Sequence, residues 1–122
     1  MGAEQKLYQK LKKATPKIIW NRVENLSVVG MPDLLGYNTN SHFFTVELKV
    51  TKSNKVRFSQ HQIAFHVKDP HNSFILVEHR GQRAVKLFSG SMIHELDACG
   101  LALEPLCLTL DACCLLLSEL GA

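Results

Sequence analysis

Three charged residues interrupt a stretch of sequence that is otherwise typical of buried β-strands. In VVGMPDLLGYNTNSHFFTVELKV, at positions 28–50, Asp33, Glu47 and Lys49 stand among Val, Leu and Phe residues. Charged side chains are almost never fully buried unless they are paired or bind a metal ion. The fold must therefore place these three side chains where an ion, a partner or solvent compensates their charge.

The residues around these charges predict a β-hairpin. Residues 31–37 and 42–50 are expected to be strands, because the turn-forming run NTNS separates them. Side chains two residues apart lie on the same face of a strand. One face of the second strand is therefore expected to be apolar, with Phe44, Val46, Leu48 and Val50, while Glu47 and Lys49 point together from the other face.

The rest of the chain predicts an α/β fold with a central mixed sheet flanked by helices. The helix at residues 59–69 is expected to begin at Ser59 and to bury Ile63 and Val67 along one stripe. The expected strands are residues 17–23, 31–37, 42–50, 72–79 and 83–88, and the expected helices are residues 3–14, 59–69 and two segments after Ser91 that Pro105 separates.

Charge is unevenly distributed along the chain. Residues 1–60 hold ten Lys and Arg residues against four acidic residues, whereas residues 61–122 hold four against seven. A basic half of a small protein attracts polyanions, and nucleic acid is the first candidate. The alternative is an ordinary solvated, lysine-rich helix.

Length and composition predict one soluble domain over residues 1–122. The four cysteines lack the paired spacing of a zinc site and are interpreted as small core residues in a reducing compartment: Cys99, Cys107, Cys113 and Cys114. The first residues do not resemble a secretory signal, and the longest apolar run falls short of the roughly 20 residues that span a bilayer. We expect an intracellular, cytoplasmic protein with no membrane partner.

The chemistry of Asp33, Glu47 and Lys49 is typical of phosphodiester hydrolysis. Two neighbouring carboxylates repel each other unless a cation lies between them, and all-oxygen ligation is what Mg²⁺ or Mn²⁺ prefers. The backbone carbonyl of Leu48 offers a further oxygen ligand. Lys49 is expected to orient the attacking water or to stabilise the developing negative charge.

The motifs GMPDLLGY, FFTVELKV and RFSQHQIAFH resemble the PD-(D/E)XK nuclease superfamily, and more narrowly the small VRR-NUC-type nucleases and archaeal-type Holliday junction resolvases. The resemblance implies a restriction-endonuclease-like αβββαβ core at residues 3–88. Residues 91–122 are expected to form a C-terminal helical extension, which matches no signature of the family. It implies that Asp33 and Glu47 bind the metal, that Lys49 is the catalytic lysine and that Gln62 is the active-site glutamine. Glu4 matches an acidic residue that many members carry in their first helix, which would make it a further metal ligand.

We therefore predict a Mg²⁺- or Mn²⁺-dependent endonuclease that hydrolyses DNA and selects branched or four-way junction DNA by shape. A homodimer through the apolar C-terminal helices would present two active sites to such a junction. The alternatives are a sequence-specific restriction or homing-type endonuclease, a non-catalytic nucleic-acid-binding module, and a protein-interaction domain. Small nucleases of this type are common in phages, so the sequence allows a phage-encoded protein that acts in a bacterial host.

Several of these residues also have a simpler structural interpretation. Asp33 and Lys49 can form a buried salt bridge that leaves Glu47 exposed on an edge. Gln62 stands three residues after Ser59, which is the spacing of a capping box. Glu4 can act only as a favourable acid in the first helical turn.

A group of basic residues is predicted to contact DNA phosphates, with ordinary solvent exposure as the alternative: Arg22, Lys52, Lys55 and Arg57. Trp20 and the Phe residues are interpreted as core residues, and no histidine is assigned to a metal.

Overall fold

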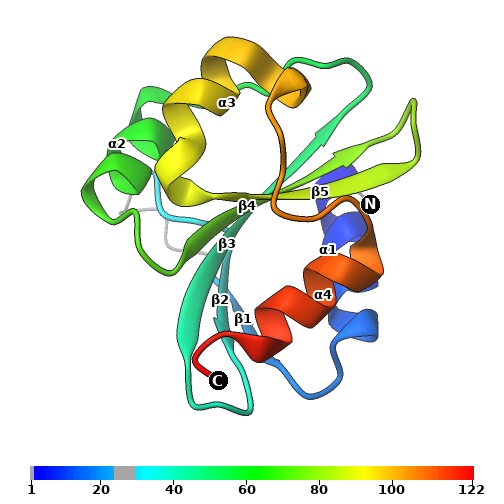
Figure 1. The fold of residues 1–122 in the computed structure, drawn as a ribbon, viewed down its shortest axis with the longest axis vertical. Coiled ribbons are helices and arrows are strands. Elements are labelled where there is room, and N and C mark those ends of the chain that lie inside the picture. Colours follow the sequence, from blue (N-terminus) through cyan, green and yellow to red (C-terminus); the bar gives the residue numbers. More distant parts are fainter. Residues whose placement is uncertain (1, 24–29) are drawn as a thin grey trace.

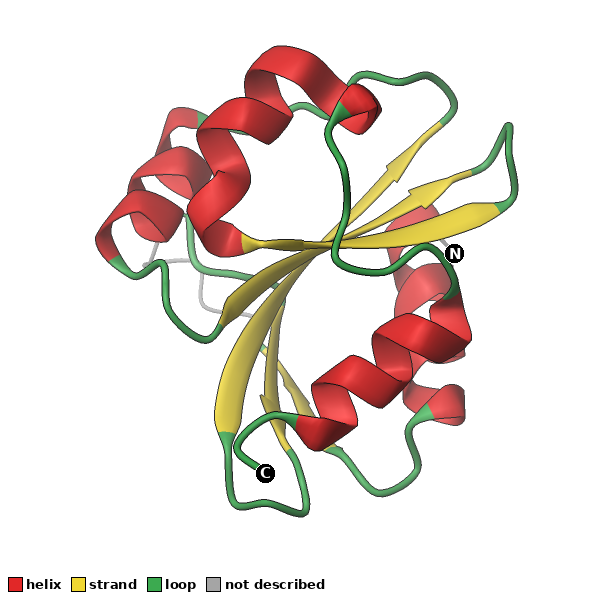
Figure 2. Ribbon diagram, in the orientation of Figure 1, coloured by secondary structure: helices red, strands yellow, loops and turns green. Residues whose placement is uncertain are grey.

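A five-stranded mixed sheet lies between two pairs of helices (Figures 1 and 2). This computed structural model describes residues 2–23 and 30–122. Helices α1 (Ala3–Ala14) and α4 (Leu110–Glu119) cover one face of the sheet, and helices α2 (Gln60–Lys68) and α3 (Ile93–Cys99) cover the other. The three layers confirm the predicted α/β fold.

The strands lie in the sheet in the same order as in the sequence. They are β1 (Ile19–Arg22), β2 (Leu34–Tyr37), β3 (Phe43–Thr51), β4 (Ser73–His79) and β5 (Ala84–Ser89). Three of the four neighbouring pairs are antiparallel, whereas β3 and β4 are parallel because α2 connects them. The sheet is therefore mixed, as predicted, and β3 is its central strand.

The alternation in β3 divides its side chains between two cores. Phe44, Val46 and Leu48 are buried against α1 and α4, in a core that includes Leu7 and Leu11. The opposite core gathers over β4 and β5 beneath α2 and α3, and its members are Val56, Ile75, Val77, Phe88, Ile93, Leu96 and Leu101. Glu47 and Lys49 are on the α2 face, as the period of two predicted.

Two predictions about buried residues on the α2 face are wrong. Val67 is 53% exposed, and the fully buried residue of α2 is instead His66. Phe43 is 57% exposed and stacks on Tyr37, with ring centroids 4.3 Å apart. Phe43 remains exposed because the core on this face lies over β4 and β5, away from the end of β3 that carries Phe43.

The C-terminal segment forms two helices on opposite faces of the sheet, with Pro105 between them as predicted. The segment that joins them runs beside β5, where Leu106 N–H donates to Leu87 O at 2.7 Å. Cys113 and Cys114 are buried, but Cys99 is exposed, so its interpretation as a core residue is wrong. None of the helices in the described part of the chain is long and apolar enough to cross a membrane.

Candidate active site

The register of the β2–β3 hairpin brings the two acidic residues together. Leu34 pairs with Val46 in an antiparallel register, so one further step sets Asp33 opposite Glu47. Residues that are directly opposite in an antiparallel pair share a face and lie roughly 5 Å apart. The two carboxyl groups are close enough for Glu47, when protonated, to hydrogen-bond to Asp33.

Pro32 ends the regular pairing of the hairpin at this point. The next pair would join Leu48 to Pro32, which has no N–H group to donate to the Leu48 carbonyl. The N–H of Leu48 is taken instead by Asp33 Oδ2, at 2.8 Å. The hairpin therefore ends where a carboxylate replaces a strand partner, and the Leu48 carbonyl receives no hydrogen bond from Pro32.

Gln62 connects Glu47 to Lys49. Its Nε2 donates to Glu47 Oε2 at 3.1 Å, and its Oε1 accepts from Lys49 Nζ at 3.1 Å. The same Oε1 accepts from Ser59 N–H at 3.0 Å, and Ser59 Oγ accepts from Gln62 N–H at 3.1 Å. Gln62 thus completes the predicted capping box and also contacts Glu47 and Lys49, whereas its role as an active-site glutamine stays a prediction.

A second contact holds Lys49 in place. Its Nζ lies 5.1 Å from the centroid of the Phe58 ring, within the range of a cation–π interaction. Together with the hydrogen bond to Gln62, this contact directs the ammonium group toward the N-terminus of α2. Lys49 forms no salt bridge with Asp33, and Glu47 is only 2% exposed, so the simpler interpretation of a salt bridge beside an exposed Glu47 is wrong.

The burial of Glu47 has a strong electrostatic cost. Desolvation is the largest cause that raises the pKa of its carboxyl group to about 9, and the neighbouring charge of Asp33 is the next, while Lys49 lowers this pKa by less. Glu47 Oε1 is buried without a hydrogen-bond partner in the described part of the chain. The site therefore presents a desolvated carboxyl oxygen that no hydrogen-bond donor among the described residues compensates.

This oxygen-rich environment fits a divalent cation. Asp33, Glu47 and the Leu48 carbonyl are all oxygen donors, which suits Mg²⁺ or Mn²⁺, and a cation would compensate both the unpartnered Oε1 and the repulsion between the carboxylates. Within residues 2–23 and 30–122, no three acidic, histidine or cysteine side chains gather into a complete metal site. A site with only two carboxylates still suits Mg²⁺, because this ion commonly binds one or two carboxylates and keeps several waters.

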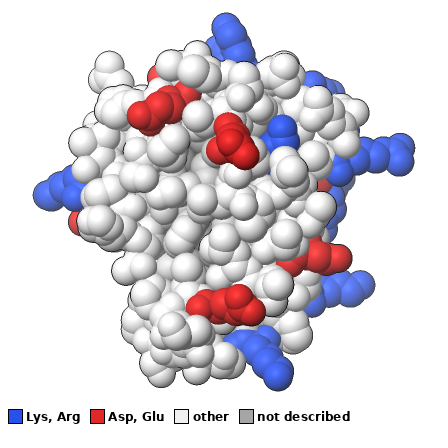
Figure 3. All heavy atoms as spheres, in the orientation of Figure 1, with Lys and Arg blue, Asp and Glu red and all other residues white. Residues whose placement is uncertain are grey.

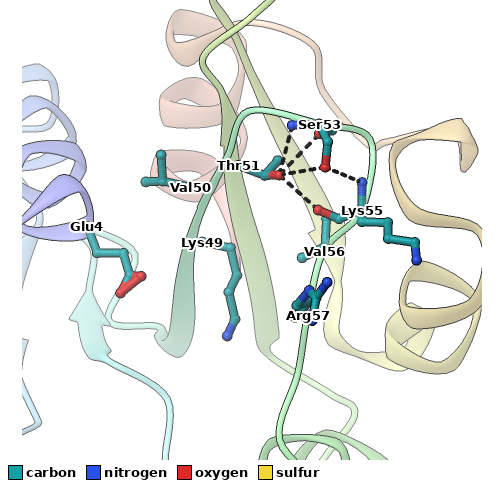
Figure 4. A pocket seen from close by; sticks show the side chains of 8 residues that line it. All are labelled: Glu4, Lys49, Val50, Thr51, Ser53, Lys55, Val56 and Arg57. Atoms are coloured by element: carbon teal, nitrogen blue, oxygen red, sulfur yellow. Dashed lines mark hydrogen bonds between the residues drawn. The ribbon is translucent and has the colours of Figure 1, made fainter.

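The loop after β3 carries Lys52, Lys55 and Arg57 and is called the basic loop. Glu4 and part of the basic loop line a hollow of about 300 Å³ beside Lys49 (Figure 4). Glu4 is exposed in the first turn of α1, and its charge contributes to the raised pKa of Glu47. Lys55 and Arg57 line the same hollow. The structure therefore brings Glu4, Lys55 and Arg57 to the side of the site where Lys49 lies.

Two of the predicted DNA-contacting residues lie elsewhere. Arg22 pairs with Leu34, whose side chain is in the core beneath α1, so Arg22 lies on the face of the sheet opposite Glu47. Its guanidinium group lies 5.7 Å from the ring centroid of Tyr8. Lys52 is exposed in the loop after β3 but does not line the hollow beside Lys49.

Sequence analysis missed His66, which is fully buried one helical turn after Gln62. Its Nδ1 hydrogen-bonds to the backbone carbonyl of Gln62 at 2.8 Å, whereas its Nε2 has no partner among the described residues. Burial lowers the pKa of His66, which favours the neutral imidazole. The spacing of four residues from Gln62 places both on one face of a helix and was the available signal.

Comparison with known proteins identifies the fold that carries this site. The chain is similar to the solved structure of Hjc, a Holliday junction resolvase from the archaeal hyperthermophile Archaeoglobus fulgidus, with a TM-score of 0.54 and 20% sequence identity. The match covers 73% of this chain and 75% of that chain. No protein-family model matches the chain, and no curated protein is similar to it in sequence. The mixed sheet and its flanking helices thus form a Holliday junction resolvase-like fold.

Proposed function

We propose that this protein is a divalent-metal-dependent endonuclease that hydrolyses phosphodiester bonds in DNA and selects branched DNA by shape. The observation that carries this proposal is that four side chains lie together on the α2 face of β3: Asp33, Glu47, Lys49 and Gln62. The resolvase-like fold supports the choice of DNA as the substrate.

In this proposal each side chain has a separate task. Asp33, Glu47 and the Leu48 carbonyl hold Mg²⁺ or Mn²⁺, and Glu4 approaches from α1 as a further acidic group. The bound ion supplies Lewis acidity and a water of lowered pKa. Lys49 stabilises the negative charge that develops on the phosphate, and Gln62 holds the lysine in position. Lys55 and Arg57 bind the phosphates beside the cut.

The test is a cleavage assay on four-way junction, flap, single-stranded and linear duplex DNA of matched sequence, with Mg²⁺, Mn²⁺ or EDTA. We expect metal-dependent cutting of the branched substrates by the parent protein and none by Lys49→Met, which keeps the length of the apolar stem. Salt-sensitive binding of DNA without cutting under any metal would show a binding module in place of an enzyme. Equal cutting by Lys49→Met would overturn the assignment of the site.

We also propose that the protein forms a homodimer through α4 and the segment before it. Leu106 and Leu108 of that segment and Leu115 of α4 are 51%, 61% and 60% exposed. The face of the molecule that carries α4 and the segment before it is mostly uncharged (Figure 3). Analytical ultracentrifugation of the parent and of the double variant Leu108→Glu/Leu115→Glu tests this. We expect the parent to be a dimer and the double variant to be a monomer. A parent protein that is monomeric at tens of micromolar would contradict it.

A further inference from the structure

A second basic surface lies away from the acidic residues. A hollow of about 470 Å³ is formed by α1, α4, β5 and the turn between β4 and β5. Its lining residues are Lys6, Lys10, Glu78, Arg80, Arg83, Val85 and Leu110. Lys and Arg side chains follow the rim of the molecule where Figure 1 places α1 and this turn (Figure 3).

The charge of this hollow is strongly positive. Four cationic side chains line it against the single carboxylate of Glu78, which forms a salt bridge with Lys10. The cations come from segments about seventy residues apart in the sequence, so a local run of charge does not explain their gathering. Arginine forks and lysine ammonium groups are the side chains that bind phosphate oxygens.

The hollow is fixed relative to the candidate active site. Arg80 N–H donates to Thr51 O at 2.9 Å, which ties the turn to the end of the strand that carries Glu47 and Lys49. Val85 belongs to the core beneath α1 and α4, so the hollow opens on the face of the sheet opposite Glu47. The two surfaces therefore face different directions on one rigid sheet.

We propose that this hollow binds the phosphates of a second DNA segment. This segment extends from the active site in a different direction from the segment that is cut. This inference rests on the proposed nuclease function and adds the source of its shape selectivity. A straight duplex laid across Glu47 leaves the hollow on the far side of the sheet. DNA has a persistence length of about 50 nm, so bending a short duplex far enough to reach both surfaces is unfavourable. A branched DNA directs two arms differently without that cost.

The backbone of Arg83 offers a variant that separates binding from stability. Its φ is 53°, in the left-handed region that Asn adopts more readily than Arg. Arg83→Asn is therefore expected to keep or raise the stability of the turn while removing a cation from the hollow. Combined with Lys6→Ala, it removes two of the four cationic groups.

The experiment measures the binding of a labelled four-way junction and of a linear duplex of equal total length, in EDTA so that neither is cut. We expect Lys6→Ala/Arg83→Asn to weaken junction binding about tenfold and duplex binding less than about twofold. The slope of log K against log salt for the junction should fall by about 1.8. The matched control is Lys13→Ala/Lys17→Ala, which removes two exposed lysines outside the hollow and should not change the preference between the two DNAs.

Three outcomes decide the proposal. Equal losses of affinity for the junction and for the duplex, or no loss of affinity for either, overturn it. The proposed nuclease function still stands in that case if the parent cuts DNA. A parent that cuts no DNA in the presence of Mn²⁺ defeats the nuclease proposal itself. A change in self-association of the double variant, with unchanged DNA binding, would assign the hollow to a second copy of the chain and also overturn the inference.

Discussion

Asp33 Oδ2 accepts a hydrogen bond from the backbone N–H of Leu48 at 2.8 Å and so takes the place of a strand partner at the end of the hairpin. Asp33 thus has both a structural task and a proposed metal-binding task.

Substitution of Asp33 can separate these two tasks. Asp33→Asn keeps an oxygen that can accept from Leu48 but removes the charge, whereas Asp33→Ala removes both. We expect both variants to lose metal-dependent cleavage by about 100-fold or more. Only Asp33→Ala should also lose about 1 kcal/mol of unfolding free energy, measured by urea denaturation, because the Leu48 N–H loses its partner. Parent-like cleavage by Asp33→Asn would remove Asp33 from the metal site.

Glu47 should make the stability of the metal-free protein fall as pH rises. The pKa of Glu47 is raised from 4.5 to about 9 in the folded chain, so between these values the folded state holds a proton that the unfolded state has lost. The unfolding free energy therefore decreases with pH across this window. Glu47→Gln has no such proton, and its stability relative to the parent should increase from pH 5 to pH 8.

Urea denaturation in EDTA at pH 5 and pH 8 measures this difference. Glu104→Gln serves as the control, because Glu104 is exposed and its carboxyl group remains in solvent when the chain unfolds. A parallel pH dependence of the parent and Glu47→Gln would show that the buried carboxyl group does not titrate abnormally.

Ser59 and Gln62 form a matched pair for testing the role of the glutamine. Either Ser59→Ala or Gln62→Ala breaks the capping box, and each should cost about 1 kcal/mol of stability. Only Gln62→Ala also removes the contacts with Glu47 and Lys49. We expect it to reduce kcat roughly 10–100-fold, as the loss of a positioning partner does, while Ser59→Ala keeps near-parent kcat. Equal kcat values for the two variants would limit Gln62 to capping.

The basic loop after β3 provides another internal comparison. Lys55 and Arg57 line the hollow beside Lys49, whereas Lys52 lies in the same loop but outside it. Lys55→Ala and Arg57→Ala should each reduce the slope of log K against log salt for DNA binding by about 0.9, the value for one phosphate contact. Lys52→Ala should leave the slope near that of the parent. The reverse order of effects would place the DNA path along a different part of the loop.

Local patterns in the sequence were enough to predict the central part of the site. The period of two in β3 placed Glu47 and Lys49 on one face, because apolar residues on the other face have to reach the core. The spacing of Ser59 and Gln62 identified the start of α2. These predictions succeeded because each depends on residues that are close in the sequence.

The features that sequence analysis did not predict depend on packing between distant segments. Phe43 is exposed because α2 and α3 pack over β4 and β5, and no pattern near Phe43 contains that information. Arg22 faces α1 because of its register with β2, which only the paired strands define. The second basic hollow joins Lys6 to Arg83, and their approach depends on the docking of α1 against the sheet.

The central position of β3 also bears on how the molecule opens. Edge strands and chain ends exchange their amide hydrogens through local fraying, whereas a strand paired on both sides opens only when larger units unfold. β3 is paired with both β2 and β4. Amides in β3 should thus be among the last to exchange, and the positions of Glu47 and Lys49 should persist while β1 and β5 open and close around them.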